Sequence, residues 1–334
     1  MKDYHFFSVT MSLLVATFLT VVVKPAFSEE SRSFHFADTA MGTIVRFTLV
    51  TENGQLAGRA AQKAFAAVHF LSRELSHRDS DGSIGAVNRA AGVEPVTVPV
   101  EVYGFIERGL AFSARTGGLF DISIGAVTTV AKGASALSVT AIKERKKLVD
   151  YRLVQLDEDS GEVFLPIKGM SLDLGGIAKG MIIDKAVQIL KAEGIAAGIV
   201  EAGGDLFCFG DKDWRVGVQH PRKPGLLGVI VVRDQAVCGS GDYYQYVIDE
   251  NSQERLHHII DPAKMKSAGK SISVTVMAPT AELADGLATT LFIMGSDQGN
   301  LFMEKEFPDC AALWVNPDSE IVKSVDFLWY QLVQ

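Results

Sequence analysis

Cysteine is scarce in this chain of 334 residues, which contains three: Cys208, Cys238 and Cys310. They lie far apart and none belongs to a C-x-x-C pair, so neither a disulfide framework nor a structural zinc site is expected. We expect small, buried, apolar thiols. One disulfide stays open as the alternative for a chain in an oxidising compartment.

Positive charge is also in short supply. There are 32 basic and 40 acidic side chains, a formal charge of −8 at pH 7. The sequence has no basic run and no stripe of alternating basic and aromatic residues, which argues against a nucleic-acid partner. It has no G-x-S-x-G, H-E-x-x-H or G-x-G-x-x-G, and "AGKS" (268–271) lacks the earlier P-loop glycine. The common hydrolase, zinc-peptidase and dinucleotide-binding signatures therefore find no support.

The N-terminal segment is predicted to be separate from the fold. The apolar stretch "MSLLVATFLTVVV" (11–23) is followed by Ala26 and Ser28, small residues at the positions that a signal peptidase recognises. This predicts a signal peptide over 1–28, a mature domain over 29–334, and a periplasmic or other extracytoplasmic location. An uncleaved membrane anchor is the alternative, because the apolar stretch is of marginal length for a bilayer span.

Apolar patterning after the signal predicts an α+β fold. Residues at helical spacing predict helices over 58–76, 98–118 and 279–295, the last with Thr280 as N-cap and Gly295 after its end. Short apolar runs separated by turn residues predict strands at 41–50 and throughout 198–278. The glycine-containing polar segments 77–92 and 131–138 are expected to be loops. We expect largely antiparallel or mixed sheets with amphipathic helices packed on them.

The stretch "SLDLGGIAKGMIID" (171–184) is chemically suggestive. It reads as a buried strand that carries Asp173, breaks at Gly175 and Gly176, and resumes as a helix with Lys179 in its first turn. Glycines there let the backbone approach a ligand, and free N–H groups favour anions. Asp173 is suited to a ring N–H, a sugar hydroxyl or a metal. The plain alternative is a tight turn that needs glycine.

Two further groups of polar residues stand out. Asp285 and Thr289 are spaced i, i+4 on the last predicted helix, so that their oxygen atoms share one face and suit Mg²⁺. A polar stripe on an amphipathic helix is the alternative. In "HHIIDP" (257–262), His258 and Asp261 lie at a strand end beside a glycine-rich region, where a proton acceptor would be useful.

Taken together, these motifs resemble the ApbE-type FAD:protein FMN transferases. The resemblance runs in order over nearly all of the mature chain. The segments that carry it are "MGT" (41–43), "DSDGSIGAVN" (79–88), "GGLFDISIG" (117–125), "LDLGGIAKGMIID" (172–184), "EAGGDLFCFG" (201–210), "GSGDY" (239–243), "HHIIDP" and "ADGLATTLFIMG" (284–295).

The resemblance implies a flavin site at sheet edges and glycine turns, with Mg²⁺ at the pyrophosphate of FAD. It implies transfer of FMN from FAD to a Thr or Ser hydroxyl of an acceptor flavoprotein, a subunit of a respiratory or extracytoplasmic redox complex, with release of AMP. The metal ligands would be Gly176 through its carbonyl, Asp285 and Thr289. His258 would take the hydroxyl proton, with Asp261 as second choice or as an orienter of His258. The FAD contacts would be Met41, Arg78, Leu119, Phe120, Asp121, Asp173, Lys179 and Ile259.

Two positions depart from the family pattern. Some members have Tyr where Arg78 stands, and some have a second acid where Ala288 stands, so that this chain has fewer metal ligands. Two alternatives follow. One alternative is a Mg²⁺-dependent FAD pyrophosphatase that gives FMN and AMP. The other is a non-catalytic periplasmic FAD-binding protein.

Overall fold

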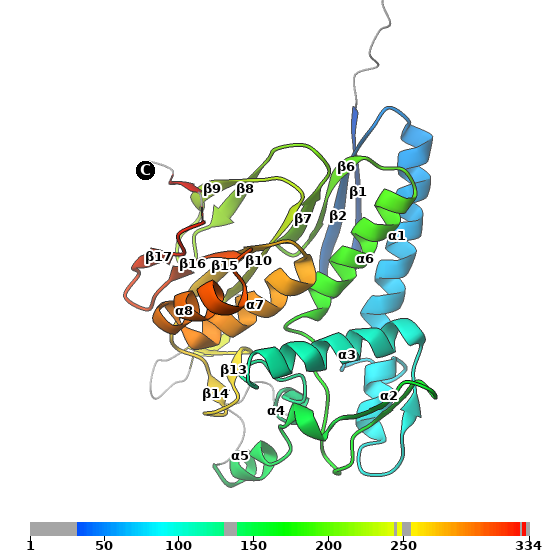
Figure 1. Ribbon diagram of the computed structural model, residues 1–334, viewed down its shortest axis with the longest axis vertical. Helices are drawn as coiled ribbons and strands as arrows, with labels where there is room; N and C mark the ends of the chain where they lie inside the picture. The colour runs from blue at the N-terminus through cyan, green and yellow to red at the C-terminus, as the bar shows by residue number, and fades with distance from the viewer. Residues whose placement is uncertain (1–31, 130–138, 244–245, 249–254, 328, 332–334) are drawn as a thin grey trace, which may run out of the picture. The chain divides into compact units, whose positions relative to one another are not determined.

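An eight-stranded sheet organises the computed structural model, which describes residues 32–129, 139–243, 246–248, 255–327 and 329–331 (Figure 1). All of these belong to one compact unit, Ser31–Gln334. Every neighbouring pair in the sheet is antiparallel. The strand order is β1 (Arg32–Ala40), β2 (Thr43–Thr51), β6 (Ala197–Ala202), β7 (Asp205–Phe209), β10 (Gln235–Gly241), β15 (Ser273–Ala278), β16 (Ala311–Val315) and β17 (Ile321–Lys323).

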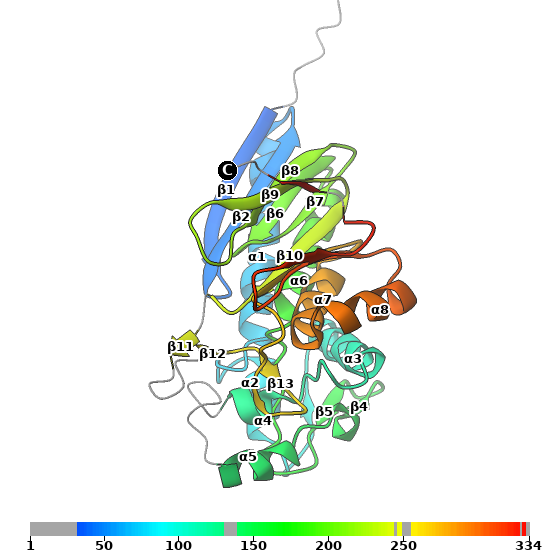
Figure 2. The ribbon, with the colours of Figure 1, turned by 90° about the vertical axis from the view of Figure 1, so that its left-hand side faces the viewer.

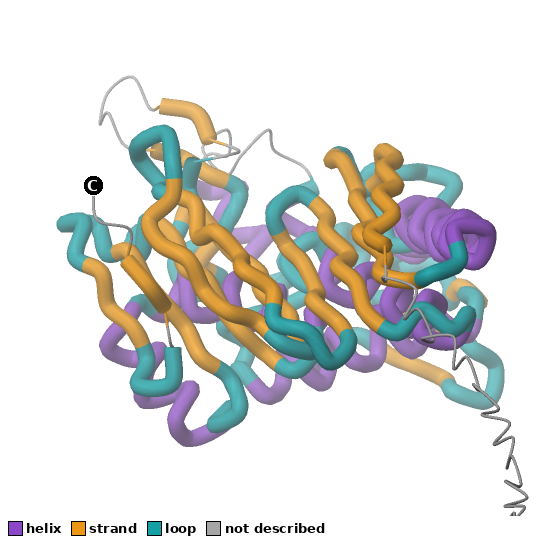
Figure 3. Tube along the Cα trace, turned by 90° about the horizontal axis from the view of Figure 1, so that it is seen from above, coloured by secondary structure: helices purple, strands orange, loops and turns teal. Residues whose placement is uncertain are grey.

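Three helices cover one face of this sheet: α1 (Gly54–Glu74), α6 (Ala178–Ala192) and α7 (Ala281–Met294) (Figures 1 and 3). Because side chains alternate along a strand, β2 turns Val45, Phe47 and Leu49 into the core beneath these helices. On α1 the buried stripe consists largely of alanines, and small side chains allow a helix to lie close to its neighbours.

A three-stranded sheet forms a second apolar core. It consists of β18 (Trp329–Gln331), β9 (Leu226–Val232) and β8 (Trp214–Gln219), in that order. On β16, Ala312 and Trp314 belong to the helix-side core, whereas Leu313 and Val315 belong to the second core with Val232 of β9. A strand buried on both sides appears in the sequence as an unbroken apolar run, as "AALWV" does.

The remaining elements lie below the helices in Figures 1 and 2. They are α2 (Ser83–Arg89), α3 (Val100–Arg115), α4 (Gly125–Thr128), α5 (Val139–Lys146), the 3₁₀ turn η2 (Tyr151–Leu153) and a small sheet of β3 (Val96–Thr97), β5 (Glu162–Phe164) and β4 (Gln155–Asp157). Helix α8 (Ser296–Glu306) follows α7. Two ribbons complete the set, β11 (Tyr246–Ile248) with β12 (Arg255–His257) and β13 (Ile260–Asp261) with β14 (Lys266–Ser267).

The α+β prediction and the three long helices are confirmed. Thr280 caps α7 by accepting a hydrogen bond from the Leu283 N–H, and Gly295 ends it at φ +80°. All three cysteines are free and buried, so the disulfide alternative is wrong. Among the described residues no helix has the length and apolarity to cross a bilayer. The predicted signal peptide and the predicted loop at 131–138 lie outside those residues.

Two local predictions are wrong. Segment 77–92 contains helix α2, because Ile84 and Val87 are buried and the Glu74 carboxylate accepts hydrogen bonds from the N–H and hydroxyl of Ser83 at the start of that helix. The expected strand at Asp173 is also absent. Ser171 makes only an isolated parallel bridge to Ile124, and Leu172 bonds to the Asn88 side chain instead of to a neighbouring strand.

Candidate functional site

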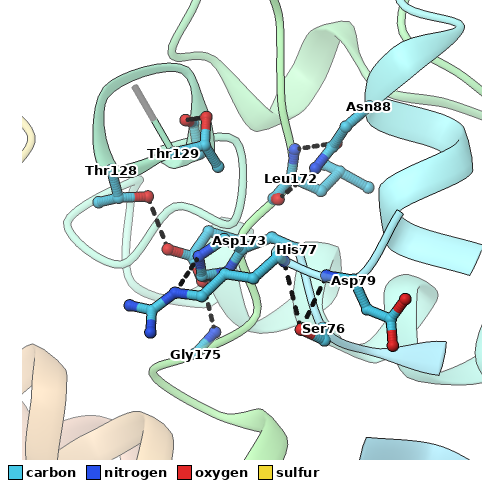
Figure 4. Close-up of polar contacts among 11 residues, drawn as sticks. Ser76, His77, Asp79, Asn88, Thr128, Thr129, Leu172, Asp173 and Gly175 are labelled. Atoms are coloured by element: carbon cyan, nitrogen blue, oxygen red, sulfur yellow. Dashed lines mark hydrogen bonds and ion pairs between the residues drawn. The ribbon is translucent and has the colours of Figure 1, made fainter. Parts of the chain in front are cut away.

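The stretch before the diglycine turn is fixed on both sides. Leu172 donates its N–H to Asn88 Oδ1 at 2.6 Å, and its carbonyl accepts from Asn88 Nδ2 at 2.9 Å (Figure 4). The next residue, Asp173, donates its N–H to the Ile122 carbonyl at 2.7 Å. The Asn88 side chain therefore makes the two hydrogen bonds to Leu172 that a neighbouring strand would otherwise make. Asp173 is held in a defined position as a result.

The Asp173 carboxylate is surrounded by donors (Figure 4). Thr128 Oγ1 donates to Oδ2 at 2.6 Å, the Gly175 N–H donates to Oδ1 at 2.8 Å, and His77 Nδ1 lies 3.1 Å from Oδ1. Burial alone would raise the pKa of Asp173, but the contacts with His77, Thr128 and Gly175 outweigh it and lower the pKa below 3.8. Asp173 is thus a fixed anion.

Glycine at position 176 is required by its neighbours. A Cβ built there would lie 2.9 Å from the ring of Phe120 and 3.1 Å from Thr289 Oγ1. The missing side chain lets the backbone reach α7, where Thr289 Oγ1 lies 3.3 Å from the Gly176 carbonyl oxygen and 3.4 Å from Ser240 Oγ. The turn therefore brings three uncharged oxygen atoms together.

Helices α6 and α7 touch closely beside this turn. A Cβ at Gly180 would lie 2.1 Å from the Ala281 carbonyl oxygen, so only glycine permits the approach. The Asp184 carboxylate accepts the N–H groups of Ala281 and Glu282, each at 2.8 Å, and thereby caps α7 from α6. Burial raises the pKa of Asp184 to about 6, despite these hydrogen bonds.

Lys179 lies between two buried acids. Its Nζ is 2.9 Å from Asp205 Oδ2 and 3.1 Å from Asp285 Oδ1; the acid side chains are 4% and 2% exposed, and that of Lys179 is 31% exposed. Backbone N–H groups complete the arrangement, from Gly239 to Asp205 at 2.8 Å and from Gly180 to Asp285 at 3.0 Å. We call Lys179, Asp205 and Asp285 the acid–lysine cluster.

The electrostatics of this cluster are dominated by burial and by mutual attraction. Burial would lower the pKa of Lys179, but the two carboxylates raise it well above its ordinary value, so the ammonium stays charged. Burial raises the pKa of Asp205 to about 6, with Asp285 adding to the rise and Lys179 opposing it. With both carboxylates ionised and the ammonium charged, the cluster has a net charge of −1, which favours a further cation.

The oxygen atoms here fit Mg²⁺ better than a softer metal. Within the described ranges, no three or more His, Cys, Asp and Glu side chains are grouped to hold an ion. The candidates are instead a carbonyl, a hydroxyl and one carboxylate, which is the donor type that Mg²⁺ prefers. Neighbouring ligands of an octahedral Mg²⁺ lie about 3 Å apart, close to the 3.3 Å between Thr289 Oγ1 and the Gly176 carbonyl oxygen.

The two predicted proton acceptors lie at the two-stranded ribbons, His258 between β12 and β13 and Asp261 on β13. His258 is exposed, whereas its neighbour His257 is buried, donates from Nε2 to the Ala268 carbonyl oxygen at 2.7 Å, and packs edge-on against Phe292 of α7. Asp261 is buried and accepts the Ala263 N–H at 2.9 Å, which shapes the turn after β13.

Three of the other predicted FAD contacts are Phe120, Asp121 and Arg78. Phe120 is buried against Phe112, and the Asp121 carboxylate accepts hydrogen bonds from Ser123 in its own turn and from the Tyr151 N–H of η2. Arg78 is exposed, and its Nε donates to His77 Nε2 at 3.3 Å, which links it to Asp173.

Three predicted contacts complete the set. Met41 is half-buried at φ +54°, a left-handed conformation that is uncommon for a residue with a side chain, and its N–H donates to Ser72 Oγ. Leu119 is half-buried and Ile259 is buried against the main core.

Hydrogen bonds, ion pairs and the diglycine turn link Arg78, Asp173, Gly176, Thr289 and the acid–lysine cluster. No described hydrogen bond or ion pair joins Met41, Leu119, Asp121, Ile259 or Asp261 to this set. Sequence reasoning missed His77, Asp205 and Ser240. The signal for the last two was present, since each belongs to a cluster of glycines and acids, "EAGGDLF" and "GSGDYY", that had no assigned role.

Comparison with known proteins decides the family. The ApbE family model matches residues 41–314. The chain belongs to the ApbE family. An FAD:protein FMN transferase of Treponema pallidum is 32% identical over 317 residues, which cover 87% of this chain and 86% of the relative. One from Klebsiella pneumoniae is 28% identical over 88% of this chain and 93% of its own length.

Solved ApbE structures share the fold. The crystal structure of the ApbE protein of Thermotoga maritima superposes with a TM-score of 0.80, at 30% identity, over 88% of this chain and 97% of that one. The flavin transferase ApbE of Vibrio cholerae superposes with a TM-score of 0.78 over 89% of this chain and 98% of its own, at 22% identity, which speaks for the fold alone.

Proposed function

We propose that this protein is an FAD:protein FMN transferase that uses Mg²⁺, attaches FMN to a Thr or Ser hydroxyl of an acceptor flavoprotein, and releases AMP. The observation that carries the proposal is the meeting of Gly176 O, Thr289 Oγ1 and the buried acid–lysine cluster at one diglycine turn. The names of the ApbE relatives support the reaction class.

The substrate FAD would lie along the contact chain from Arg78 to Thr289. Asp173, held as an anion, suits a ring N–H or sugar hydroxyl of the dinucleotide. Lys179 remains charged and partly exposed, so its ammonium is available to a phosphate oxygen. Arg78 is exposed, is linked to Asp173 through His77, and has a planar guanidinium that can stack on a ring or pair with phosphate.

Mg²⁺ would be held by the Gly176 carbonyl, Thr289 and Asp285, where it would neutralise charge on the pyrophosphate. Phosphoryl transfer needs positioning and charge neutralisation more than a covalent catalyst. The buried acids are fixed by the N–H groups of Gly180 and Gly239, so these groups need little reorganisation during the reaction.

In the proposed step, the acceptor hydroxyl oxygen bonds to the phosphorus of the FMN half of FAD. The bond from that phosphorus to the bridging oxygen breaks, and AMP leaves with that oxygen. The hydroxyl proton passes to His258, whose exposure suits an incoming protein substrate. Asp261 is the second candidate acceptor.

The predicted signal peptide supports an extracytoplasmic location, and with it an acceptor that is a subunit of a respiratory or other extracytoplasmic redox complex. A signal-less and a full-length form expressed in bacteria would test this. We expect cleavage after Ser28 and recovery of the full-length form from the periplasm; retention in the membrane would instead indicate an anchor.

The reaction is tested by mixing the protein with FAD, Mg²⁺ and a flavin-acceptor domain, followed by a denaturing gel imaged for flavin fluorescence. We expect a fluorescent acceptor band that EDTA abolishes. Free FMN and AMP with a dark acceptor would identify an FAD pyrophosphatase. Intact FAD with several acceptors would identify a binding protein.

A further inference from the structure

Asp205 is not one of the proposed metal ligands, yet it is among the most buried acids of the described chain. Its side chain is 4% exposed. Oδ1 accepts the Gly239 N–H, and apart from the Lys179 ammonium no described donor reaches Oδ2. A buried carboxylate is costly unless it is paired, so an acid with one charged partner needs an explanation.

The geometry points to a role through Lys179. We propose that Asp205 is a positioning residue that draws the Lys179 ammonium away from Asp285 and thereby keeps Asp285 available to a divalent cation. The inference rests on the proposed function, because it assumes that Asp285 is a metal ligand.

The distances from the Lys179 ammonium to the two acids support this role of Asp205. Nζ of Lys179 donates a hydrogen bond to Asp285 Oδ1 at 3.1 Å and forms an ion pair with Asp205 Oδ2 at 2.9 Å, so the ammonium is shared between the two acids. Without the charge of Asp205, all of the attraction of Lys179 would fall on Asp285. An ammonium bound tightly to a carboxylate competes with a cation for the same oxygen atoms.

The net charge of the acid–lysine cluster also makes cation binding depend on Asp205. The cluster sums to −1 with both acids ionised, and it becomes neutral when Asp205 loses its charge. A divalent cation is attracted less to a neutral site. Removing residues that support metal ligands commonly weakens metal affinity about 10- to 100-fold. The substitution Asp205→Asn keeps an acceptor for the Gly239 N–H, so it removes the charge with little change to the packing.

The chain also offers a matched control. Asp184 is a partly buried acid whose pKa burial raises to about 6, like that of Asp205, and it holds the same helix α7 by capping it. No described contact joins it to Lys179. Asp184→Asn therefore tests whether a disturbance of α7 alone alters metal affinity.

The experiment is a titration of the purified protein with Mn²⁺ alone, with free Mn²⁺ counted by electron paramagnetic resonance. We expect one site in the wild type and binding at least about tenfold weaker in Asp205→Asn. In Asp205→Asn/Lys179→Met, which removes the competitor as well, we expect affinity near that of the wild type. Lys179→Met alone should bind more tightly than the wild type, and Asp184→Asn should bind equally well.

Three results would overturn the inference: equal binding by the wild type and Asp205→Asn, an equal loss in Asp184→Asn, or no recovery in the double variant. If Asp205→Asn fails to fold, as seen by circular dichroism, the direction of change in Lys179→Met decides. A wild type that binds no Mn²⁺ would overturn the proposed metal site, and this inference with it.

Discussion

The two sides of the candidate site are built differently. The proposed metal side, with Asp285 and Thr289, lies on α7, packed against α6 and β10 and fixed by backbone N–H groups. The proposed acceptor side, with His258, lies between two-stranded ribbons of two or three residues per strand, where its side chain is exposed. The groups proposed to neutralise developing charge are thus held by fixed hydrogen bonds. The group that would meet a protein substrate is on the surface.

Among substitutions that test this comparison, we expect Asp285→Ala to have the largest effect. We expect Mg²⁺-dependent transfer to fall by about 10³-fold, because a proposed ligand of the charge-neutralising Mg²⁺ is lost. The fold should survive, since Lys179 keeps Asp205 as its partner. Initial rates of acceptor labelling and the thermal unfolding midpoint would be measured together. Full activity would refute the metal assignment.

On the acceptor side, His258→Ala should slow transfer by about 10²-fold, since general-base catalysis contributes that much. The FAD dissociation constant should change little, because the proposed polar contacts Arg78, Asp173 and Lys179 lie outside the ribbons. Single-turnover rates and a fluorescence titration with FAD separate the two quantities. The exposed His35 on β1, replaced by Ala, is the control. Equal loss of binding and rate would make His258 a pocket residue.

The cap between α6 and α7 predicts a pH dependence of stability. The pKa of Asp184 is raised from 3.8 to about 6 in the folded state, so the folded protein binds more protons than the unfolded chain between these values. This contribution to stability is present at low pH and is lost as the pH rises through about 6. Between pH 4.5 and 6.5 the wild type should lose about 2 kcal/mol relative to Asp184→Asn.

Urea unfolding of both proteins at several pH values measures that difference. A difference that is constant with pH would show that Asp184 titrates at an ordinary pKa and that its burial is compensated. The catalytic residues take no part in this comparison, so it probes only the rigidity of the metal side.

The smallest effect is expected at the loop that holds Asp173. His77→Ala removes one of three donors to that carboxylate, and loss of a charged hydrogen bond should weaken FAD binding about tenfold. Mn²⁺ affinity should stay unchanged, and His77→Gln, which restores an N–H donor, should recover part of the loss. An effect on Mn²⁺ instead of FAD would contradict the separate roles of the two ends of the site.

Much of the fold was predictable because its signals are local. The helical spacing of α1, the cap Thr280 and the stop at Gly295 can be read directly from residues that lie near one another in the chain. Helix α2 was not predictable, since it depends on Glu74, which lies nine residues before Ser83 and acts through the folded structure.

In the site, too, features that depend on nearby residues were predictable, and contacts between distant segments were not. The spacing of Asp285 and Thr289 predicts a shared face, and the glycines of "DLGG" predict a close approach. The pairing of Asp205 with Lys179, and of His77 with Asp173, joins segments that are distant in sequence, and periodicity carries no information about such contacts. The absent strand at Asp173 has a similar cause, because Asn88 supplies its hydrogen bonds from α2.

The most direct test of the central claim is the intact mass of an acceptor domain after incubation with FAD, Mg²⁺ and either the wild type or Asp285→Ala. We predict that the acceptor gains the mass of one FMN group with the wild type, on a Thr or Ser, and that AMP appears in equal amount. We predict no gain with the variant. An unchanged acceptor mass with the wild type, together with free FMN, would contradict the transferase assignment.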